Sequence, residues 1–180
     1  MMLAIKSNVI ACLFFIHAKV SLSLDKMKSK IYNLKEVKSR IRFYCAKEDR
    51  CQQQVMDKLL DYGVSLSVSE EILLELILEK YVDEERYARS FCSGKFKIKK
   101  WGRRKIIFEL KKKKVSEVNI QKGLEEIDEE AYLQTLQHLL EKKKSLTNDT
   151  NQFIRKKKMV DYVVRKGFES DLVWEAAHNL

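Results

Sequence analysis

The sequence predicts an all-α protein, built as a tandem array of three three-helix repeats that is elongated and curved. Three observations predict this fold class. The 180 residues contain no proline and only five glycines, while Lys, Glu, Leu and Ile are abundant, which favours helices joined by short loops. No segment alternates apolar and polar residues cleanly enough for a strand. An apolar pattern also recurs after about 50 residues, which is typical of repeat proteins.

The second helix of each repeat is the clearest element. Three segments align: "VMDKLLDYGVS" (55–65), "IIFELKKKKVS" (106–116) and "MVDYVVRKGFE" (159–169). Each has two adjacent apolar residues, a third three positions later, a short link and one large apolar residue: Val55, Met56, Leu59 and Val64; Ile106, Ile107, Leu110 and Val115; Met159, Val160, Val163 and Phe168. We expect these apolar residues in the core, together with Phe108 in the middle copy.

A third helix follows each link, in "SVSEEILLELI", "SEVNIQKGLEEI" and "ESDLVWEAAHNL". Apolar pairs at i, i+4 predict the buried side of each: Ile72 and Leu76, Ile120 and Leu124, and Leu172 and Ala176. Ser67 with Glu70 has the spacing of a capping box. Ser116 and Ser170 are expected to be N-caps without an acidic partner three residues later.

The first helix of the second and third repeats also matches, in "VDEERYARSF" (82–91) and "IDEEAYLQTL" (127–136). Asp83 and Asp128 are expected N-caps, and the glutamates after them suit the positive end of a helix. The expected domains are therefore a first repeat at 27–82, a second at 83–127 and a third at 128–180. The third carries an insertion, "KKKSLTNDTNQF", after its first helix. Stacking of the repeats must complete the core.

Residues 1–26 differ from the repeats. The apolar run "VIACLFFI" (9–16) is shorter than the roughly 20 residues that a membrane helix needs. We interpret residues 1–26 as a leader or a misassigned start upstream of Met27, with the start error favoured, and we expect a cytoplasmic monomer. The four cysteines, Cys12, Cys45, Cys51 and Cys92, form no C-x-x-C motif, so reduced thiols are expected rather than a metal site.

The charge distribution indicates an anionic partner. The formal net charge is +10, with a pI near 9.4, and between residues 95 and 114 eleven of twenty residues are basic against one acid, Glu109. Like charges four apart on a helix repel, so an idle solvated face is disfavoured. The candidate binding residues are Lys95, Lys97, Lys99, Lys100, Trp101, Arg103, Arg104, Lys105, Lys111, Lys112, Lys113, Lys114, Lys156, Lys157, Lys158 and Arg165. Trp101 either stacks on a base or caps the core at a helix junction, and the core interpretation is favoured.

Enzymatic function is disfavoured. The carboxylates at the starts of the repeated helices are explained by capping, and the three histidines are scattered. The sequence has no glycine-rich phosphate loop and no G-x-S-x-G motif. We therefore expect no catalytic residue, no metal, no cofactor and no small-molecule substrate.

The run from Tyr81 to Leu136 resembles the RecX recombination regulators. The residues that carry this resemblance are Asp83, Arg86, Tyr87, Ala88, Gly102, Lys105, Ile106, Glu109 and Leu110. The segment "FYCAKEDRCQQQVMDKLLDYGVS" (43–65) is similar to the opening repeat of that family, and the resemblance extends over about residues 30 to 180. The chain departs from the family at Lys114, where the other two links have Gly63 and Gly167, and in its first 26 residues.

The resemblance implies a regulator of homologous recombination, DNA repair and the SOS response. RecX-like proteins bind the RecA recombinase filament on single-stranded DNA and restrain its extension, ATP hydrolysis and strand exchange, with no catalytic residue and no membrane. We expect the candidate cations to face the filament, and reversal of Arg103, Arg104 and Lys105 to weaken inhibition without unfolding. A stand-alone basic helical DNA-binding protein is the alternative, and an exported or membrane-surface protein is a further one.

Overall fold

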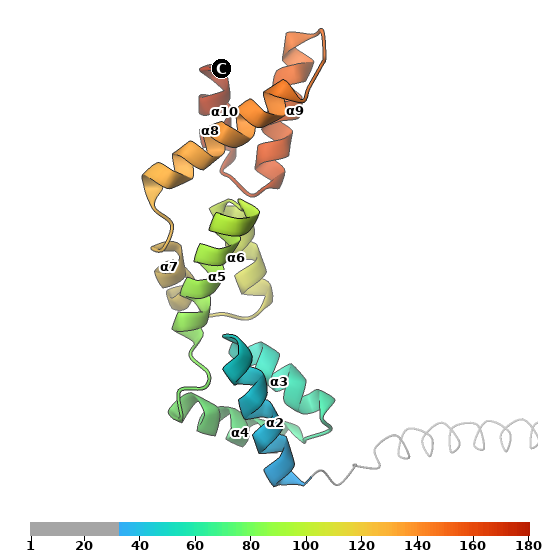
Figure 1. Cartoon of the computed structure of the whole chain (residues 1–180), viewed down its shortest axis with the longest axis vertical. Coiled ribbons are helices and arrows are strands. Elements are labelled where there is room, and N and C mark those ends of the chain that lie inside the picture. The colour runs from blue at the N-terminus through green and yellow to red at the C-terminus, as the bar shows by residue number, and fades with distance from the viewer. Residues whose placement is uncertain (1–32) are drawn as a thin grey trace, which may run out of the picture.

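The computed structural model describes residues 33–180, and within them it contains nine helices and no strand (Figure 1). The helices follow one another in three groups of three, which are stacked into an elongated, curved array. The predicted fold class is therefore confirmed. The predictions for residues 1–26 lie outside the described residues.

The three groups have the order predicted from the sequence. The first contains α2 (Leu34–Lys47), α3 (Gln52–Asp61) and α4 (Leu66–Leu78); the second α5 (Glu84–Lys99), α6 (Arg103–Lys112) and α7 (Glu117–Leu124); the third α8 (Glu129–Ser145), α9 (Gln152–Arg165) and α10 (Ser170–His178). We propose to divide the repeats after Val82 and after Ile127, because both are buried and each precedes a helix-capping aspartate.

Three of the predicted N-caps are confirmed. The Asp83 carboxylate accepts a hydrogen bond from the backbone N–H of Arg86 at 3.0 Å, and Asp128 accepts one from Ala131 at 2.8 Å. The Ser116 hydroxyl accepts from Asn119 at 3.4 Å. These side chains satisfy backbone donors that a helix leaves unpaired at its start.

Two predicted caps are wrong by one or two residues. Helix α4 begins at Leu66 with Ser65 as its N-cap, so Ser67 lies inside the first turn and forms no capping box with Glu70. Helix α10 begins at Ser170 itself, with Glu169 at the N-cap position. In both cases the sequence offers neighbouring polar residues as alternative caps.

The buried residues form two separate cores. Repeat 1 has its own core, around Ile41, Leu59 and Leu76. Repeats 2 and 3 share a continuous core whose members include Ile106, Leu110, Tyr132, Val163 and Phe168, all of them fully buried. Among the described residues of repeat 1, Cys51 alone lies in this shared core. The second and third repeats therefore behave as one packed body, in which each covers apolar surface of the other.

Two predictions about the core need correction. In α10 the fully buried residues are Val173 and Ala177, whereas Leu172 and Ala176 are only partly buried. Phe108 was expected in the core, but its side chain is 65% exposed. Since Ile106 and Leu110 already form the inner side of α6, a residue midway between them must face outward.

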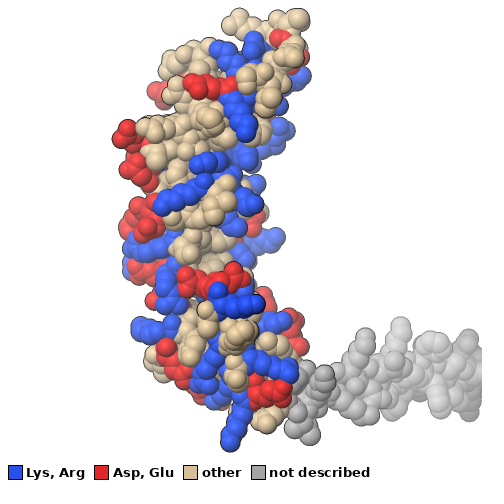
Figure 2. Space-filling model, viewed as in Figure 1, with Lys and Arg blue, Asp and Glu red and all other residues tan. Residues whose placement is uncertain are grey.

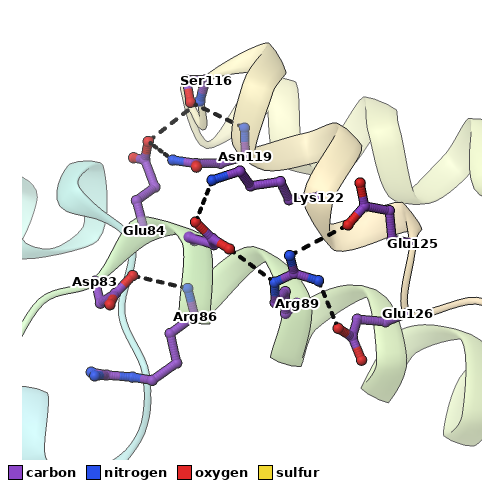
Figure 3. A network of polar contacts seen from close by, with 10 residues as sticks. Asp83, Glu84, Arg86, Arg89, Ser116, Asn119, Lys122, Glu125 and Glu126 are labelled. Atoms are coloured by element: carbon purple, nitrogen blue, oxygen red, sulfur yellow. Dashed lines mark hydrogen bonds and ion pairs between the residues drawn. The ribbon is translucent and has the colours of Figure 1, made fainter.

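Helices α5 and α7 make the tightest contact within a repeat. A Cβ atom on Gly123 would lie 2.8 Å from the carbonyl oxygen of Ala88 and 2.9 Å from the sulfur of Cys92, so only glycine fits there. Ion pairs and hydrogen bonds line the same contact (Figure 3): Lys122 with Glu85 at 2.6 Å, Arg89 with Glu126 at 2.8 Å and Asn119 with Glu84 at 3.1 Å.

The joint between repeats 2 and 3 is a direct backbone contact. The N–H of Gly102 donates to the carbonyl of Lys166 at 2.9 Å, and the N–H of Arg104 donates to the carbonyl of Gly167 at 3.0 Å. The end of α9 therefore abuts the start of α6, and carbonyls freed at one helix end pair with N–H groups freed at the other. Gly102 and Gly167 let the two backbones approach this closely.

The three links share one conformation although the middle link lacks glycine. Gly63 has φ +83°, Gly167 has φ +97° and Lys114 has φ +57°, all in the left-handed region. The next residue donates its N–H back into the preceding helix at 3.2 Å in the first two links, Val64 to Leu59 and Val115 to Leu110. The departure at Lys114 therefore leaves the link geometry unchanged and places strain on a lysine.

We expect Lys114→Gly to raise the free energy of unfolding by about 1 kcal/mol. The left-handed conformation costs a non-glycine residue roughly 1–2 kcal/mol, and the greater freedom of glycine in the unfolded chain offsets part of this gain. Urea denaturation measures the change. Lys113→Gly is the matched control, because φ is −88° at Lys113 and glycine relieves no strain there. A gain of the same size in both variants would contradict the explanation.

Candidate functional site

The predicted binding residues lie at the end of α5, along α6 and α9, and in the short segments that follow α5 and α6. Figure 2 shows blue atoms gathered along the edge of the array where α6 and α9 lie, and red atoms gathered on the opposite edge beside α7 and the start of α8. The acids of that second edge are Glu84, Glu85, Glu125, Glu126, Glu129 and Glu130. The edge along α6 and α9 is therefore mainly basic, whereas the opposite edge mixes acids with Arg89 and Lys122, which pair with them.

We define the basic ridge as the exposed residues Arg104, Phe108 and Lys112 of α6 with Lys157 and Arg165 of α9. The three α6 residues are spaced four apart and face away from the core. The end of α9 adjoins the start of α6, so Arg165 and Arg104 lie on either side of the joint. The two helices thus present cations in one succession, interrupted on α9 by the exposed Asp161, four residues from both Lys157 and Arg165.

Arg103 does not belong to the ridge, because it holds repeats 2 and 3 together. Its guanidinium forms an ion pair with Glu129 and lies 4.1 Å from the centre of the Tyr132 ring. Its backbone N–H donates to the Tyr132 hydroxyl at 3.1 Å, and that hydroxyl donates to Glu169 at 2.6 Å. Reversal of Arg103 would place three carboxylates around one buried phenol, so it is unsuitable for testing binding alone.

Burial and polar contacts explain the protonation of this joint. Burial lowers the pKa of Arg103, but the hydrogen bond to Glu129 and the charge of that residue together raise the pKa by more. The pKa of Arg103 therefore lies above its ordinary value. Burial raises the pKa of Tyr132 strongly, and its hydrogen bond to Glu169 adds to the shift. The arginine therefore stays charged and the phenol stays protonated, as the contacts require.

Several other predicted cations have partners inside the chain. Lys111 pairs with Glu117 at 3.0 Å, and Lys158 pairs with Asp149 at 2.8 Å. Lys105 lies 4.6 Å from the centre of the Trp101 ring. The remaining predicted cations are Lys95, Lys97, Lys99 and Lys100 at the end of α5, Lys113 and Lys114 at the end of α6 and Lys156 on α9.

Trp101 packs against the core, as the favoured interpretation expected, and stacking on a base stays a prediction. It is half-buried and packs against the shared core, which fits a capping role at the junction between α5 and α6. It also lines an open pocket with Lys95, whose ammonium nitrogen is 5.3 Å from the indole centre. The part of the ring outside the core is therefore set among cations.

Sequence reasoning missed Phe108 on the ridge and Lys166 at the joint between repeats 2 and 3. Phe108 was assigned to the core, although the spacing of Arg104, Phe108 and Lys112 at four residues could have placed it on the outer side. Lys166 was not chosen, and its backbone carbonyl receives the hydrogen bond from Gly102 at the joint. No sequence signal indicates that the Lys166 carbonyl accepts this hydrogen bond, because the contact joins residues that are far apart in the chain.

The rest of the described chain offers little chemistry. Residues 33–180 contain no cluster of three or more His, Cys, Asp or Glu side chains that could hold a metal ion. Cys45, Cys51 and Cys92 are buried free thiols, and burial raises the pKa of Cys92 to about 12, which leaves it protonated. None of the helices described here is long and apolar enough to cross a membrane.

Comparison with known proteins points to one family. Residues 83–124 match the model of the second three-helix domain of RecX, and residues 129–177 match the model of its third three-helix domain. The chain is 28% identical over 130 residues to the regulatory protein RecX of Bacillus cytotoxicus, which is 72% of this chain and 48% of that protein. It is also 28% identical over 137 residues to the regulatory protein RecX of Prosthecochloris aestuarii, 76% of this chain and 88% of that protein.

The chain spans about half the length of several relatives, including those from Bacillus cytotoxicus and Leuconostoc mesenteroides. Among solved structures, RecX from Lactobacillus salivarius has a TM-score of 0.73 at 19% identity, over 81% of this chain and 95% of that one. A second crystal structure of a regulatory protein RecX has a TM-score of 0.73 at 21% identity, over 81% and 71% of the two chains. These likenesses support the helical fold. Because the two domain models together match half of the chain, and because the repeat order and fold agree with them, the chain belongs to the RecX family.

Proposed function

We propose that this protein binds the RecA recombinase filament on single-stranded DNA and restrains its extension, ATP hydrolysis and strand exchange. The observation that carries the proposal is the basic ridge, which runs over the second and third repeats, the two that match the family models. A filament on DNA presents a polyanion along its length. A succession of exposed cations on a packed, two-repeat body suits such a target.

The geometry favours binding over catalysis. Lysine and arginine on exposed helix faces can hold phosphates or carboxylates without contacting base edges, because their charges act over distance and in many orientations. An extended array also offers a surface longer than any single helix. Both features suit a regulator that lies along a filament.

A titration of RecA ATP hydrolysis tests the proposal. Purified protein is added to RecA on single-stranded DNA, and hydrolysis is followed as the concentration rises. We expect dose-dependent loss at protein concentrations well below that of RecA, because blocking a growing filament end affects many subunits. Full hydrolysis at equimolar protein would contradict the proposal, and tight DNA binding with no RecA effect would favour the stand-alone DNA-binding alternative.

A further inference from the structure

An open pocket of about 540 Å³ lies at the joint between repeats 1 and 2. The segment from Glu48 to Gln54 forms one side, the middle and end of α5 form another, and Glu109 and Lys113 of α6 close it. Its volume suits one nucleotide or a group of similar size.

Aromatic rings form much of the lining. Phe91 and Trp101 both line the pocket, and the ammonium nitrogen of Lys95 lies 5.0 Å from the centre of the first ring and 5.3 Å from the centre of the second. Tyr87 also lines it, with its ring centre 5.8 Å from that of Phe91. Aromatic walls next to mobile ammonium groups are the features that bind the bases and phosphates of single strands.

The charge of the lining is positive once the internal pairs are counted. Glu48 is paired with Arg50, and Asp49 is paired with Arg86 at 2.7 Å, so both acids are neutralised. The cations left are Lys95, Lys99 and Lys113, against Glu109. An anionic group entering the pocket therefore meets a net excess of positive charge.

Gly94 keeps one wall of the pocket open. A Cβ atom built there would meet nothing within 4 Å, so packing does not require glycine at this position. A glycine inside a helix is destabilising relative to alanine, yet α5 has one in the wall that faces the open space. A larger side chain at Gly94 would extend into the pocket without touching the core.

We propose that this pocket binds one nucleotide of single-stranded nucleic acid, with its base stacked on Trp101 and its phosphates contacted by Lys99 and Lys113. Stacking on an aromatic side chain tightens the binding of a single strand about tenfold per base. A base would displace the half-buried contact between Lys95 and the indole, which is weaker than such stacking. The exchange therefore favours the base. The assignment rests on the proposed function only in that the filament supplies the single strand.

Fluorescence of Trp101 tests the assignment directly. The sequence has two tryptophans, so Trp174→Phe leaves Trp101 as the only one. We expect a short oligodeoxythymidylate to quench this fluorescence, and an abasic deoxyribose-phosphate oligomer of equal length to bind about tenfold more weakly without quenching, the loss expected for one stacked base. Equal binding of the two oligomers, or an unquenched Trp101, would overturn the assignment. Equal binding and quenching by poly-glutamate would also overturn it, in favour of an acidic protein segment.

Gly94→Leu in the same background blocks the pocket while keeping every charge. We expect it to abolish the quenching and to lower affinity for the oligodeoxythymidylate about tenfold, with helix content unchanged by circular dichroism. Gly94→Ala is the matched control, because a methyl group leaves most of the pocket open. Unchanged quenching in Gly94→Leu would overturn the proposal.

The RecA assay separates this proposal from the proposed function. Suppose that the wild-type protein restrains ATP hydrolysis, and that the oligomer still binds Gly94→Leu and quenches its Trp101 fluorescence. The nucleotide assignment to the pocket is then wrong and the proposed function stands. If instead the wild-type protein has no effect on RecA, and Gly94→Leu abolishes the quenching, then the nucleotide assignment stands and the proposed function fails.

Discussion

Gly102→Ala is expected to lower the free energy of unfolding by about 3 kcal/mol, at the upper end for an overpacked site. The added Cβ would lie 2.2 Å from both the carbonyl carbon of Gly167 and the backbone nitrogen of Phe168. These are backbone atoms, so no side-chain rotation relieves the contact. The two helix ends must separate, which breaks the hydrogen bonds from Gly102 and Arg104 and opens the shared core beside Phe168.

Urea denaturation followed by circular dichroism measures this loss. Gly94→Ala is the control, since it makes the same chemical change in a place with open space around it. We expect the control to raise the free energy of unfolding by up to about 1 kcal/mol, because alanine is the better helix former. If both substitutions change stability in the same direction, the close approach of α6 and α9 is not what constrains Gly102.

The order of helices in the repeats could be predicted because it depends on the spacing of residues that are close in the sequence. Apolar residues three and four apart mark the inner side of each helix, and an aspartate before a helix supplies its cap whatever lies elsewhere. Asp83 and Asp128 were predicted correctly for this reason. Periodicity fixes a helix face only to within a residue, however. In α10, Leu172 and Val173 are adjacent and both apolar, and the tertiary packing buries Val173 fully and Leu172 only in part.

The binding surface was less predictable, because the partners that occupy a cation lie far away in the chain. Arg103 and Glu129 are 26 residues apart, and nothing in the local sequence distinguishes Arg103 from the exposed Arg104 beside it. The pocket at the joint of repeats 1 and 2 likewise combines three separate segments. Charge density predicted that this region binds an anion, and only the packing shows which charges remain available.

The joint between repeats 2 and 3 determines how the cations of the basic ridge are spaced. Arg104 stands at the start of α6 and Arg165 at the end of α9, so the contacts of Gly102 set the spacing between the cations of the two repeats. The shared core of repeats 2 and 3 makes that spacing rigid. Repeat 1 has its own core and meets repeat 2 at Cys51 and at the ion pair between Arg86 and Asp49.

We expect reversal of three ridge cations to weaken the restraint of RecA ATP hydrolysis. The variant Arg104→Glu, Lys112→Glu, Lys157→Glu should need at least tenfold more protein than the wild type for the same loss of hydrolysis. All three side chains are exposed, and none has a carboxylate partner within the described residues. If each contacts a phosphate, then the slope of log affinity for single-stranded DNA against log salt should decrease by about two, since each contact on a single strand contributes about 0.7. The salt titration thus counts contacts, whereas the ATPase assay measures their consequence.

The matched control reverses three exposed lysines away from the ridge, Lys35 and Lys47 of α2 and Lys142 of α8. The control has the same net charge as the test variant, so a non-specific effect of charge would weaken both equally. We expect the control to keep its salt slope and its restraint of RecA nearly unchanged. The free energy of unfolding of both variants should lie within about 1 kcal/mol of the wild-type value, because exposed positions tolerate substitution. Equal losses in the two variants would show that overall charge, rather than the ridge formed by α6 and α9, determines binding.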